Sequence, residues 1–242
     1  MGGDWRPMLR FRMQTPSLRE RFHNSPDYVL EARYMRCPAH EEVPMPPTPT
    51  IEIVPYDARW PEAFAALARP IAEAMGDLAL RVDHIGSTSV PGLAAKDIID
   101  IQVTVADLAD EAIVTSLAAL GFTQHPTITG DHIPPGLSEA EADPTRWRKR
   151  YFRAPESMRP MHLHVRQAGL PNQRYPLLFR DYLRATPMAA GAYRQIKEAL
   201  ARLHPDDVEA YYDVKDPACD LIVGAAELWA AQTGWTADGA LS

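Results

Sequence analysis

The sequence predicts an α+β fold, in which a small mixed β-sheet flanked by helices is followed by a purely helical segment. Segments rich in β-branched residues are confined to residues 51–167, whereas from residue 172 onward the apolar residues recur at helical spacing. No strand–helix unit repeats along the chain, so a repeating βαβ array is not expected. The 242 residues, 46% of them hydrophobic, suffice for one ordinary domain with a full core and some extra length.

The first elements follow from one helical and three strand patterns. A helix is predicted to begin at Trp60, because Pro61 fits a first helical turn, and to end at Gly76. Its apolar residues recur every three to four positions and therefore share one face. That face consists of Phe64, Leu67, Ile71 and Met75. Strands are predicted at residues 51–55, 81–85 and 98–105.

The middle of the sequence predicts a helix, a long loop and a hairpin. A helix is expected over residues 107–120, and residues 121–124 follow it as a candidate strand. Residues 127–145 hold Pro, Gly and Asp and predict a loop, and long loops in compact domains are often functional. Residues 147–153 and 161–167 are predicted to pair as a hairpin around a turn of Pro, Glu and Ser. The inward residues of the helix are Ile113, Leu117 and Leu120.

The remainder of the sequence predicts four helices. The first covers residues 172–185, and Thr186-Pro187 caps and starts the second. A short helix is expected over residues 206–214, and Asp216-Pro217 would start a separate last helix. The second helix is expected to pack through Tyr193, Ile196, Leu200 and Leu203, and the last through Leu221, Ala225 and Leu228.

Composition divides the chain into three parts. Residues 1–50 hold eight prolines and lack a long periodic pattern, which predicts an extension with little structure of its own. Two interpretations stay open for it, a leader or overlong start and an arm that binds a protein partner. Residues 51–235 form the predicted domain, and residues 236–242 form a tail.

Charge and cysteine content restrict the class of protein. The net charge of −7 argues against a general nucleic-acid binder, since such proteins carry a basic excess. Cys37 and Cys219 lie far apart and in no metal-binding spacing, which favours a reducing compartment and a cytoplasmic location. No apolar run is long enough to span a membrane, and no secretory signal is recognisable.

The segment after the strand 81–85 predicts a phosphate-binding turn. Gly86 allows a ligand to approach the backbone closely, and three hydroxyl residues follow it. Exposed amides and hydroxyls of this kind hold phosphate oxygens, and Lys96 adds a positive charge. The spacing matches neither a P-loop nor a nucleophile elbow, and a plain turn between strands is the alternative. The hydroxyl residues are Ser87, Thr88 and Ser89.

Strand alternation identifies an acid on the next strand. In an extended segment Lys96, Asp100 and Gln102 point to one face, together with Ile98 and Thr104. An acid between isoleucines in a buried strand costs free energy unless it is paired or binds a metal. Asp100 is therefore the first candidate for catalysis, and a structural partner for Lys96 or a histidine is the alternative.

Two histidines and several basic residues complete the candidate site. His162 and His164 share one strand face and are predicted to bind one metal or one phosphate, although either is also compatible with a buried structural role. Arg150, in the basic run of residues 146–153, and Lys215, four residues after Tyr211, are predicted ligand contacts. A solvated basic face is the alternative interpretation of that run. Lys197, four residues after Tyr193, is a weaker candidate.

Several motifs together resemble the GrpB-like family. The main one is the segment from His84 to Ile101, HIGSTSVPGLAAKDIIDI, and the resemblance covers roughly residues 51–235. The others are His162-Leu-His-Val165, Phe179-Arg-Asp-Tyr-Leu183, Tyr193 to Lys197, Tyr211 to Lys215 and Ala226 to Trp229.

The resemblance implies a nucleotidyltransferase-like fold with a small mixed β-sheet, flanking helices and a C-terminal helical segment. Members of that superfamily hold nucleotide phosphates at a Gly-Ser turn, here Gly86-Ser87, and a divalent metal at two carboxylates, of which Asp100 matches the first. The second position is Gln102, and a histidine appears in place of the third carboxylate. Such a set suits Zn²⁺ or Mn²⁺ better than a pair of Mg²⁺ ions. The expected metal ligands are His84, Asp100, Gln102, His162 and His164.

Three functions are compatible with these residues. The first is transfer of a nucleotidyl group from a nucleoside triphosphate to a small acceptor, with Asp100 holding a divalent metal and His162 or His164 acting as base. The second is a non-catalytic nucleotide-binding or phosphometabolite-binding module. The third is a hydrolase or lyase with a metal held by Asp100 and histidines. A small-molecule nucleotide is the expected partner in the first two.

Overall fold

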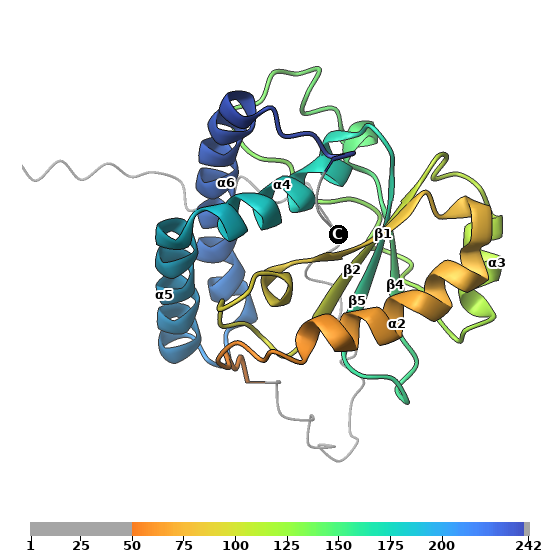
Figure 1. The fold of residues 1–242 in the computed structure, drawn as a ribbon, viewed down its shortest axis with the longest axis horizontal. Coiled ribbons are helices and arrows are strands. Elements are labelled where there is room, and N and C mark those ends of the chain that lie inside the picture. The colour runs from red at the N-terminus through yellow and green to blue at the C-terminus, as the bar shows by residue number, and fades with distance from the viewer. Residues whose placement is uncertain (1–49, 240–242) are drawn as a thin grey trace, which may run out of the picture. The chain divides into compact units, whose positions relative to one another are not determined.

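A five-stranded mixed sheet organises the part of the chain that the structure, a computed structural model, describes, residues 50–239. The strand order is β1-β2-β5-β4-β3, with β2 and β5 parallel and the other neighbours antiparallel. This is a mixed α/β fold with the predicted hairpin between β4 and β5 (Figure 1). The strands are β1 (Arg81–Ile85), β2 (Ile99–Val105), β3 (Thr123–Gln124), β4 (Arg150–Arg153) and β5 (Met161–Gln167).

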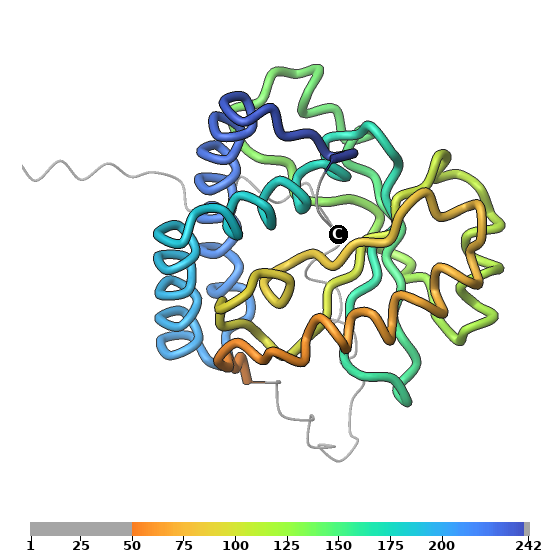
Figure 2. Tube along the Cα trace, in the orientation of Figure 1, coloured from red at the N-terminus to blue at the C-terminus, as the bar shows by residue number. Residues whose placement is uncertain are grey.

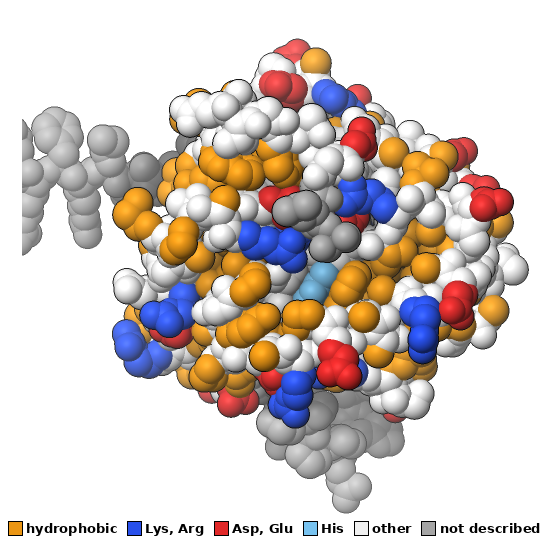
Figure 3. All heavy atoms as spheres, viewed as in Figure 1, with side chains coloured by type: hydrophobic (Ala, Val, Ile, Leu, Met, Phe, Trp, Pro, Cys, Tyr) orange, Lys and Arg blue, Asp and Glu red, His pale blue; other side chains and the backbone are white. Residues whose placement is uncertain are grey.

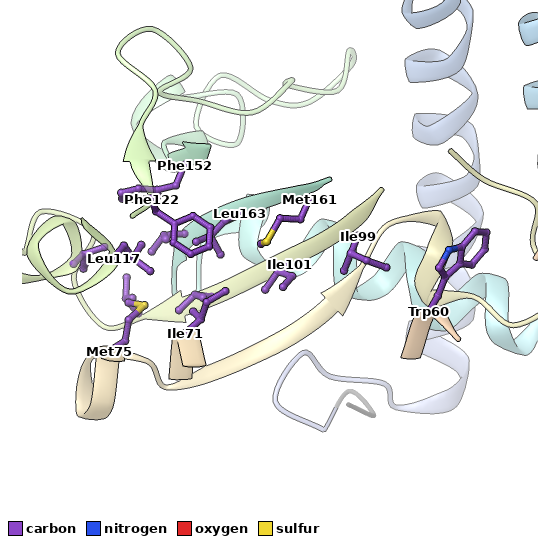
Figure 4. Close-up of a cluster of buried hydrophobic side chains, with 14 of the residues drawn as sticks. Trp60, Ile71, Met75, Ile99, Ile101, Leu117, Phe122, Phe152, Met161 and Leu163 are labelled. Atoms are coloured by element: carbon purple, nitrogen blue, oxygen red, sulfur yellow. The ribbon is translucent and has the colours of Figure 1, made fainter. Parts of the chain in front are cut away.

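One face of the sheet forms the main hydrophobic core against helices α2 (Trp60–Met75) and α3 (Ala112–Ala118). Alternate residues of β2 and β5 point to this face, and Ile99, Ile101 and Leu163 are fully buried there. Figure 4 shows their side chains close together with those of α2 and α3. The other residues of the same strands, which are polar, therefore point to the opposite face.

The three long helices after the sheet pack against one another through a second core. They are α4 (Pro171–Ala185), α5 (Pro187–Leu203) and α6 (Val208–Thr233). In Figures 1 and 2, α5 and α6 run alongside each other and α4 runs across them. Helix α4 also contacts β1 and β5. The helical layer thus lies next to the polar side of the sheet, where the candidate residues of β2 and β5 point.

A buried arginine attaches α4 to the sheet. The side chain of Arg180 has no exposed area, and it donates to the His84 carbonyl at 2.9 Å and to Asp181 at 2.7 Å. On β1, Arg81 forms an ion pair with Asp83 at 2.6 Å, and its guanidinium also donates to the carbonyl of Ala237. The charged residues of the Phe179–Leu183 motif therefore hold α4 against the strand that leads into the Gly86 turn.

The structure corrects three predicted elements. Residues 51–55 form no strand within the described region, and only a bridge joins Val54 to Ala95. Helix α3 begins at Ala112 rather than at residue 107, because the side chains of Asp107 and Asp110 accept from the amides two residues later and stabilise turns there. The two helices expected over 206–214 and from Pro217 are one helix, α6, with Pro217 inside it.

The inward face of α6 also differs from the prediction. Leu221 and Leu228 are 80% and 69% exposed, and Ala225 is exposed as well. The buried residues of α6 are Tyr211, Val223, Ala226 and Ala230, of which the last three belong to the core shared with α4 and α5. A second apolar stripe therefore faces outward on α6. It consists of Val214, Pro217, Leu221, Gly224, Leu228 and Ala231.

Two earlier predictions concern other features. The proline-rich extension lies outside the described residues, apart from its last position. In the described part, no helix is both long and apolar enough to cross a membrane.

Candidate functional site

The turn between β1 and β2 places bare backbone directly against Asp100. Gly86 has φ +70°, a conformation that residues with a Cβ rarely adopt. A Cβ added to Gly86 would lie 2.2 Å from Oδ2 of Asp100. Ile85 is paired with Asp100 across the two strands, so the turn leaves β1 immediately above this carboxylate. Only glycine allows this approach.

Two of the three hydroxyl groups of the turn are bonded within the protein. Thr88 Oγ1 lies 3.0 Å from Nε2 of His84, and Ser89 Oγ donates to the Gly86 carbonyl at 2.6 Å. Both residues are buried, so the prediction that their hydroxyls bind phosphate is not supported by this geometry. Ser87 is partly exposed at the start of the short 3₁₀ helix Ser87–Ser89, where the first amides have no acceptor within the helix.

Asp100 is a partly buried carboxylate without a protein partner. No group in the described region donates a hydrogen bond to it or forms an ion pair with it. Burial raises its pKa, although the charges of His162 and Lys215 act in the opposite direction. The carboxylate therefore remains available to a ligand, a proton or a cation.

All four lysines of the chain interact electrostatically with Asp100. They are Lys96, Lys149, Lys197 and Lys215. None of them is fully exposed, whereas exposed cations elsewhere in the described part are arginines. Lys149 and Lys215 are also paired with Asp131 and Asp216. The charges of all four lysines nevertheless act on one carboxylate in an acidic chain, and local positive charge of this kind favours an anionic ligand.

Two of these lysines lie among aromatic rings of α6. The Lys96 ammonium is 4.5 Å from the ring centroid of Tyr211 and 5.0 Å from that of Tyr212. Lys215 contacts Asp216 at 3.1 Å and lies 5.2 Å from the Tyr212 ring. Burial lowers the pKa of Lys96, and the neighbouring charge of Lys215 lowers it further. An anion between these two ammonium groups would relieve their mutual repulsion.

Lys197 is the most deeply buried cation of the cluster. Its side chain is 2% exposed, and its ammonium donates to the carbonyl of Ala94 at 2.5 Å and lies 4.7 Å from the Tyr193 ring. Burial, assisted by the charge of Lys215, lowers the pKa of Lys197 to about 7. The sequence indicated the Tyr193–Lys197 spacing but not that this lysine is enclosed.

The two histidines of β5 lie beside Asp100 and Gln102, because β2 and β5 pair in parallel register at these positions. His162 is opposite Asp100, and its Nδ1 lies 2.5 Å from the hydroxyl of Tyr151. His164 is opposite Gln102, and burial together with the charges of nearby cations lowers its pKa well below the ordinary value. His164 is therefore neutral at pH 7.

Gln102 belongs to a buried polar network next to His164. Its amide oxygen accepts from Arg166 at 2.8 Å, and its amide nitrogen donates to the Gln173 carbonyl at 3.0 Å. Arg166 also binds both oxygens of Asp131, whose side chain accepts from Lys149. The sequence analysis missed Arg166 and Asp131. Strand alternation could have placed Arg166 beside the two histidines, but nothing local indicated its partner in the loop.

Two of the residues predicted to contact a ligand point away from the sheet face that holds Asp100. His84 points to the opposite face of the sheet from Asp100, because it pairs with Ile101, and its ring stacks on Phe64 at 4.7 Å. Arg150 points to that same opposite side and is bonded to the Leu108 carbonyl at 2.7 Å and to Glu111. Both side chains serve packing and the anchoring of a loop, so neither reaches the polar face.

A two-metal site does not fit these residues. Within residues 50–239, no three His, Cys, Asp or Glu side chains come together as a set of metal ligands. Both amide atoms of Gln102 are already bonded, and the cation Arg166 lies next to His164. Asp100 alone fits a single divalent ion whose other ligands would be phosphate oxygens, an arrangement common for Mg²⁺. Such an ion would neutralise part of the charge of a bound polyphosphate.

A cavity of about 190 Å³ adjoins this cluster between the 131–147 segment, α4 and α6. Arg166 and Lys215 line it, and the same two cations act on Asp100. The structure thus brings together Gly86, Ser87, Lys96, Asp100, His162 and Lys215 as one candidate site with an adjoining cavity.

Comparison with known proteins gives one consistent family. The model of the GrpB protein family matches residues 50–224. A protein named dephospho-CoA kinase from Mycolicibacterium paratuberculosis is 37% identical over 195 residues, which are 76% of this chain and 48% of that protein. A UPF0157 protein from Halalkalibacterium halodurans is 36% identical over 171 residues, 70% of this chain and 79% of that protein.

A solved structure has the same fold. The crystal structure of the conserved protein GrpB from Enterococcus faecalis is 31% identical, with a TM-score of 0.60, and the match covers 74% of this chain and 99% of that one. The chain spans about half the length of the first curated relatives that it matches. The family match covers most of the described residues, including the Gly86 turn, Asp100 and the four lysines, and the chain belongs to the GrpB family.

Proposed function

We propose that this chain binds a nucleoside triphosphate or a related phosphorylated metabolite at the polar face of its sheet. The observation that carries the proposal is the position of Lys96 and Lys215 in a protein of net charge −7. Their ammonium groups lie 5.0 Å and 5.2 Å from the same Tyr212 ring, and both charges act on Asp100. Clustered positive charges in a partly buried site attract anions. Polyphosphates carry the highest charge among common metabolites.

The groups of the site have distinct tasks in this proposal. Lys96 and Lys215 neutralise phosphate charge, and the open amides at Ser87 hold phosphate oxygens beside the Gly86 backbone. Asp100 would repel a phosphate unless it is protonated or shares a cation with it. Binding is therefore expected to strengthen when a divalent metal is present.

The relatives support a nucleotide as the ligand class. Dephospho-CoA, in the printed name of one relative, contains a phosphorylated adenosine, and this chain covers 48% of that protein. The shared region extends over 195 residues, which are 76% of this chain. We therefore take adenosine phosphates as the first ligands to test.

Nucleotidyl transfer is the second candidate, and the arrangement of Tyr151, His162 and Asp100 favours it. His162 connects to the Tyr151 hydroxyl through Nδ1 and lies opposite Asp100 on the neighbouring strand. Asp100 or His162 would accept the proton of an acceptor hydroxyl. The hydroxyl oxygen then bonds to the α-phosphorus, the bond from that phosphorus to the β-phosphate oxygen breaks, and pyrophosphate leaves.

Calorimetric titration of ATP, with and without Mg²⁺ or Mn²⁺, tests the binding proposal. We expect binding by the wild type, a loss of at least tenfold in affinity in Lys215→Met, and loss of the metal dependence in Asp100→Asn. Arg59→Met is the matched control, because Arg59 is an exposed cation at 83% side-chain exposure. Absence of ATP binding, or equal losses in Lys215→Met and Arg59→Met, would contradict the proposal.

Release of pyrophosphate from ATP in the presence of small hydroxyl acceptors tests the transfer candidate separately. Turnover that disappears in Asp100→Asn and falls in His162→Gln, while the folded state is retained, would support it. Binding without any pyrophosphate release across acceptors would leave the binding function and exclude transfer to those acceptors.

A further inference from the structure

The cavity beside the lysine cluster has a wall of aromatic surface. Trp147 and Tyr175 both line it, and their ring centroids are 6.5 Å apart at an interplanar angle of 70°. Their polar atoms are already used, since the Trp147 indole donates to the Glu141 carbonyl at 2.8 Å and the Tyr175 hydroxyl donates to Asp220 at 2.9 Å. The two residues therefore offer the cavity ring surface rather than hydrogen-bonding groups.

One residue of the lining, Asn172, has an enclosed amide oxygen without a hydrogen-bond partner. Asn172 is 1% exposed, and its amide nitrogen donates to Asp131 at 3.1 Å and to the Arg148 carbonyl at 2.8 Å. Both partners are acceptors, so the orientation of the amide is fixed. Its Oδ1 has no hydrogen-bond donor in the described part of the chain. A buried acceptor left unpaired costs about 1–3 kcal/mol, and a ligand N–H would remove that cost.

Two cations connect the cavity with the proposed phosphate site. Arg166 and Lys215 belong to its lining and also act on the carboxylate of Asp100. Its volume of about 190 Å³ is below the range of roughly 300–1,000 Å³ typical of pockets that enclose a whole drug-sized ligand. It therefore suits one ring system at the end of a molecule whose charged part lies at the lysines.

We propose that this cavity is the subsite for the amino-bearing base of the nucleotide, which packs against Trp147 and Tyr175 and donates an N–H to Oδ1 of Asn172. The proposal rests on the proposed nucleotide-binding function and adds the group that the site recognises. Because Oδ1 of Asn172 is enclosed, this contact requires the cavity to widen on binding. The adjoining 131–147 segment, which has only short stretches of regular structure, is where that movement is expected.

A series of ligands on the wild-type protein tests the subsite without a mutation. We would measure the affinities of ATP, of purine riboside triphosphate, which lacks the amino group, and of inorganic tripolyphosphate. The expected order is ATP tightest, then purine riboside triphosphate weaker by five- to tenfold, then tripolyphosphate weaker again by tenfold or more. Equal affinities of ATP and purine riboside triphosphate would overturn the contact with Asn172, and equal affinities of ATP and tripolyphosphate would overturn the subsite.

Two variants of Tyr175 provide a matched pair. Tyr175→Leu should weaken ATP at least fivefold and leave tripolyphosphate unchanged, whereas Tyr175→Phe retains the ring and should bind ATP within twofold of the wild type. If Tyr175→Leu weakens both ligands equally, the cavity does not recognise the base. If neither ATP nor tripolyphosphate binds the wild type, the proposed function itself fails, whereas tight but equal binding of both overturns only the subsite.

Discussion

Gly86 carries a steric requirement that is specific to one side chain, the carboxylate of Asp100. Gly86→Ala would force a Cβ to within 2.2 Å of Oδ2 while the backbone is held at φ +70°. With ψ −172° this backbone conformation is one that only glycine commonly adopts. We expect a loss of folding free energy above the roughly 1–3 kcal/mol that such a conformation alone costs a residue with a Cβ. Urea unfolding followed by tryptophan fluorescence measures it.

Gly169→Ala is the control for this change, because Gly169 has φ +76° and nothing within 4 Å of its added Cβ. The double variant Gly86→Ala/Asp100→Gly should recover the part of the loss that comes from the collision. Equal losses in the two single variants would show that the contact with Asp100 does not matter for stability.

Lys197 predicts a dependence of stability on pH. Burial lowers its pKa from the model-peptide value of 10.5 to about 7 in the folded state, so the unfolded chain binds more protons between these values. The free energy of unfolding should therefore rise with pH through this window. Below about pH 7 the folded protein carries the full destabilisation of a buried, charged Lys197. The free energy of unfolding of Lys197→Met should rise less between pH 7 and pH 9 than that of the wild type.

Chemical denaturation of both proteins at several pH values measures this difference, because the other titrating groups are common to the two and cancel. Parallel curves for wild type and Lys197→Met would show that Lys197 keeps an ordinary pKa. Lys197→Arg is a useful second control, since a guanidinium remains charged across the whole window.

At the scale of single residues, the sequence located Asp100 and the Gly86 turn because both signals are local. An acid between isoleucines and a glycine after a strand are visible in a short window. The bonding of Gln102 to Arg166 joins residues 64 positions apart, and the contact of Arg166 with Asp131 depends on where a long loop folds. Periodicity predicts neither contact, and the prediction of Gln102 as a metal ligand rests on the family resemblance alone.

Among the elements, α6 shows how an apolar pattern can mislead. Leu221→Glu should change the thermal unfolding midpoint by only a degree or two, because Leu221 is 80% exposed. Val223→Glu, two residues away on the buried face, should lower it strongly, since Val223 is only 9% exposed and an unpaired charge would be buried there. Equal effects of the two substitutions would mean that the outward stripe is covered in the native protein.

The elements that the sequence predicted well have both residues that mark their ends and a periodic pattern of apolar residues. Strands β1 and β5 occur over the predicted residues, and α2 begins at Trp60 with a proline in its first turn. Helix α6 has two apolar stripes, and Leu221 and Leu228 lie on the one that faces outward. Periodicity reports that a stripe exists, but which stripe packs against α4 and α5 is decided by the shape of the partners.

For the whole molecule, the contrast between net charge and local charge predicts a strong effect of salt. The affinity for ATP should fall several-fold as ionic strength rises from low values to about 0.5 M, where the Debye length is far below its value of about 10 Å at 0.1 M. The net charge of −7 by itself would give the opposite trend for an anionic ligand. Figure 3 shows acidic and basic side chains interspersed over one face, without a basic stripe.

Titration calorimetry of ATP at a series of NaCl concentrations checks this expectation, with a sulfate series to detect direct competition for the lysines. Affinity that rises with salt would indicate that the overall negative field dominates. In that case the lysine cluster would have to be neutralised by its own protein partners rather than by a ligand.

Because the chain has only four lysines, digestion by a lysine-specific protease can report on the region around Asp100. A protease that cleaves only after lysine has four possible sites in the entire sequence, and the charge of each of these lysines acts on Asp100. Two of them, Lys197 and Lys215, are inside helices, so cleavage there requires local opening. The digestion rate would therefore measure how often this region opens, and a bound ligand should prolong the survival of the intact chain.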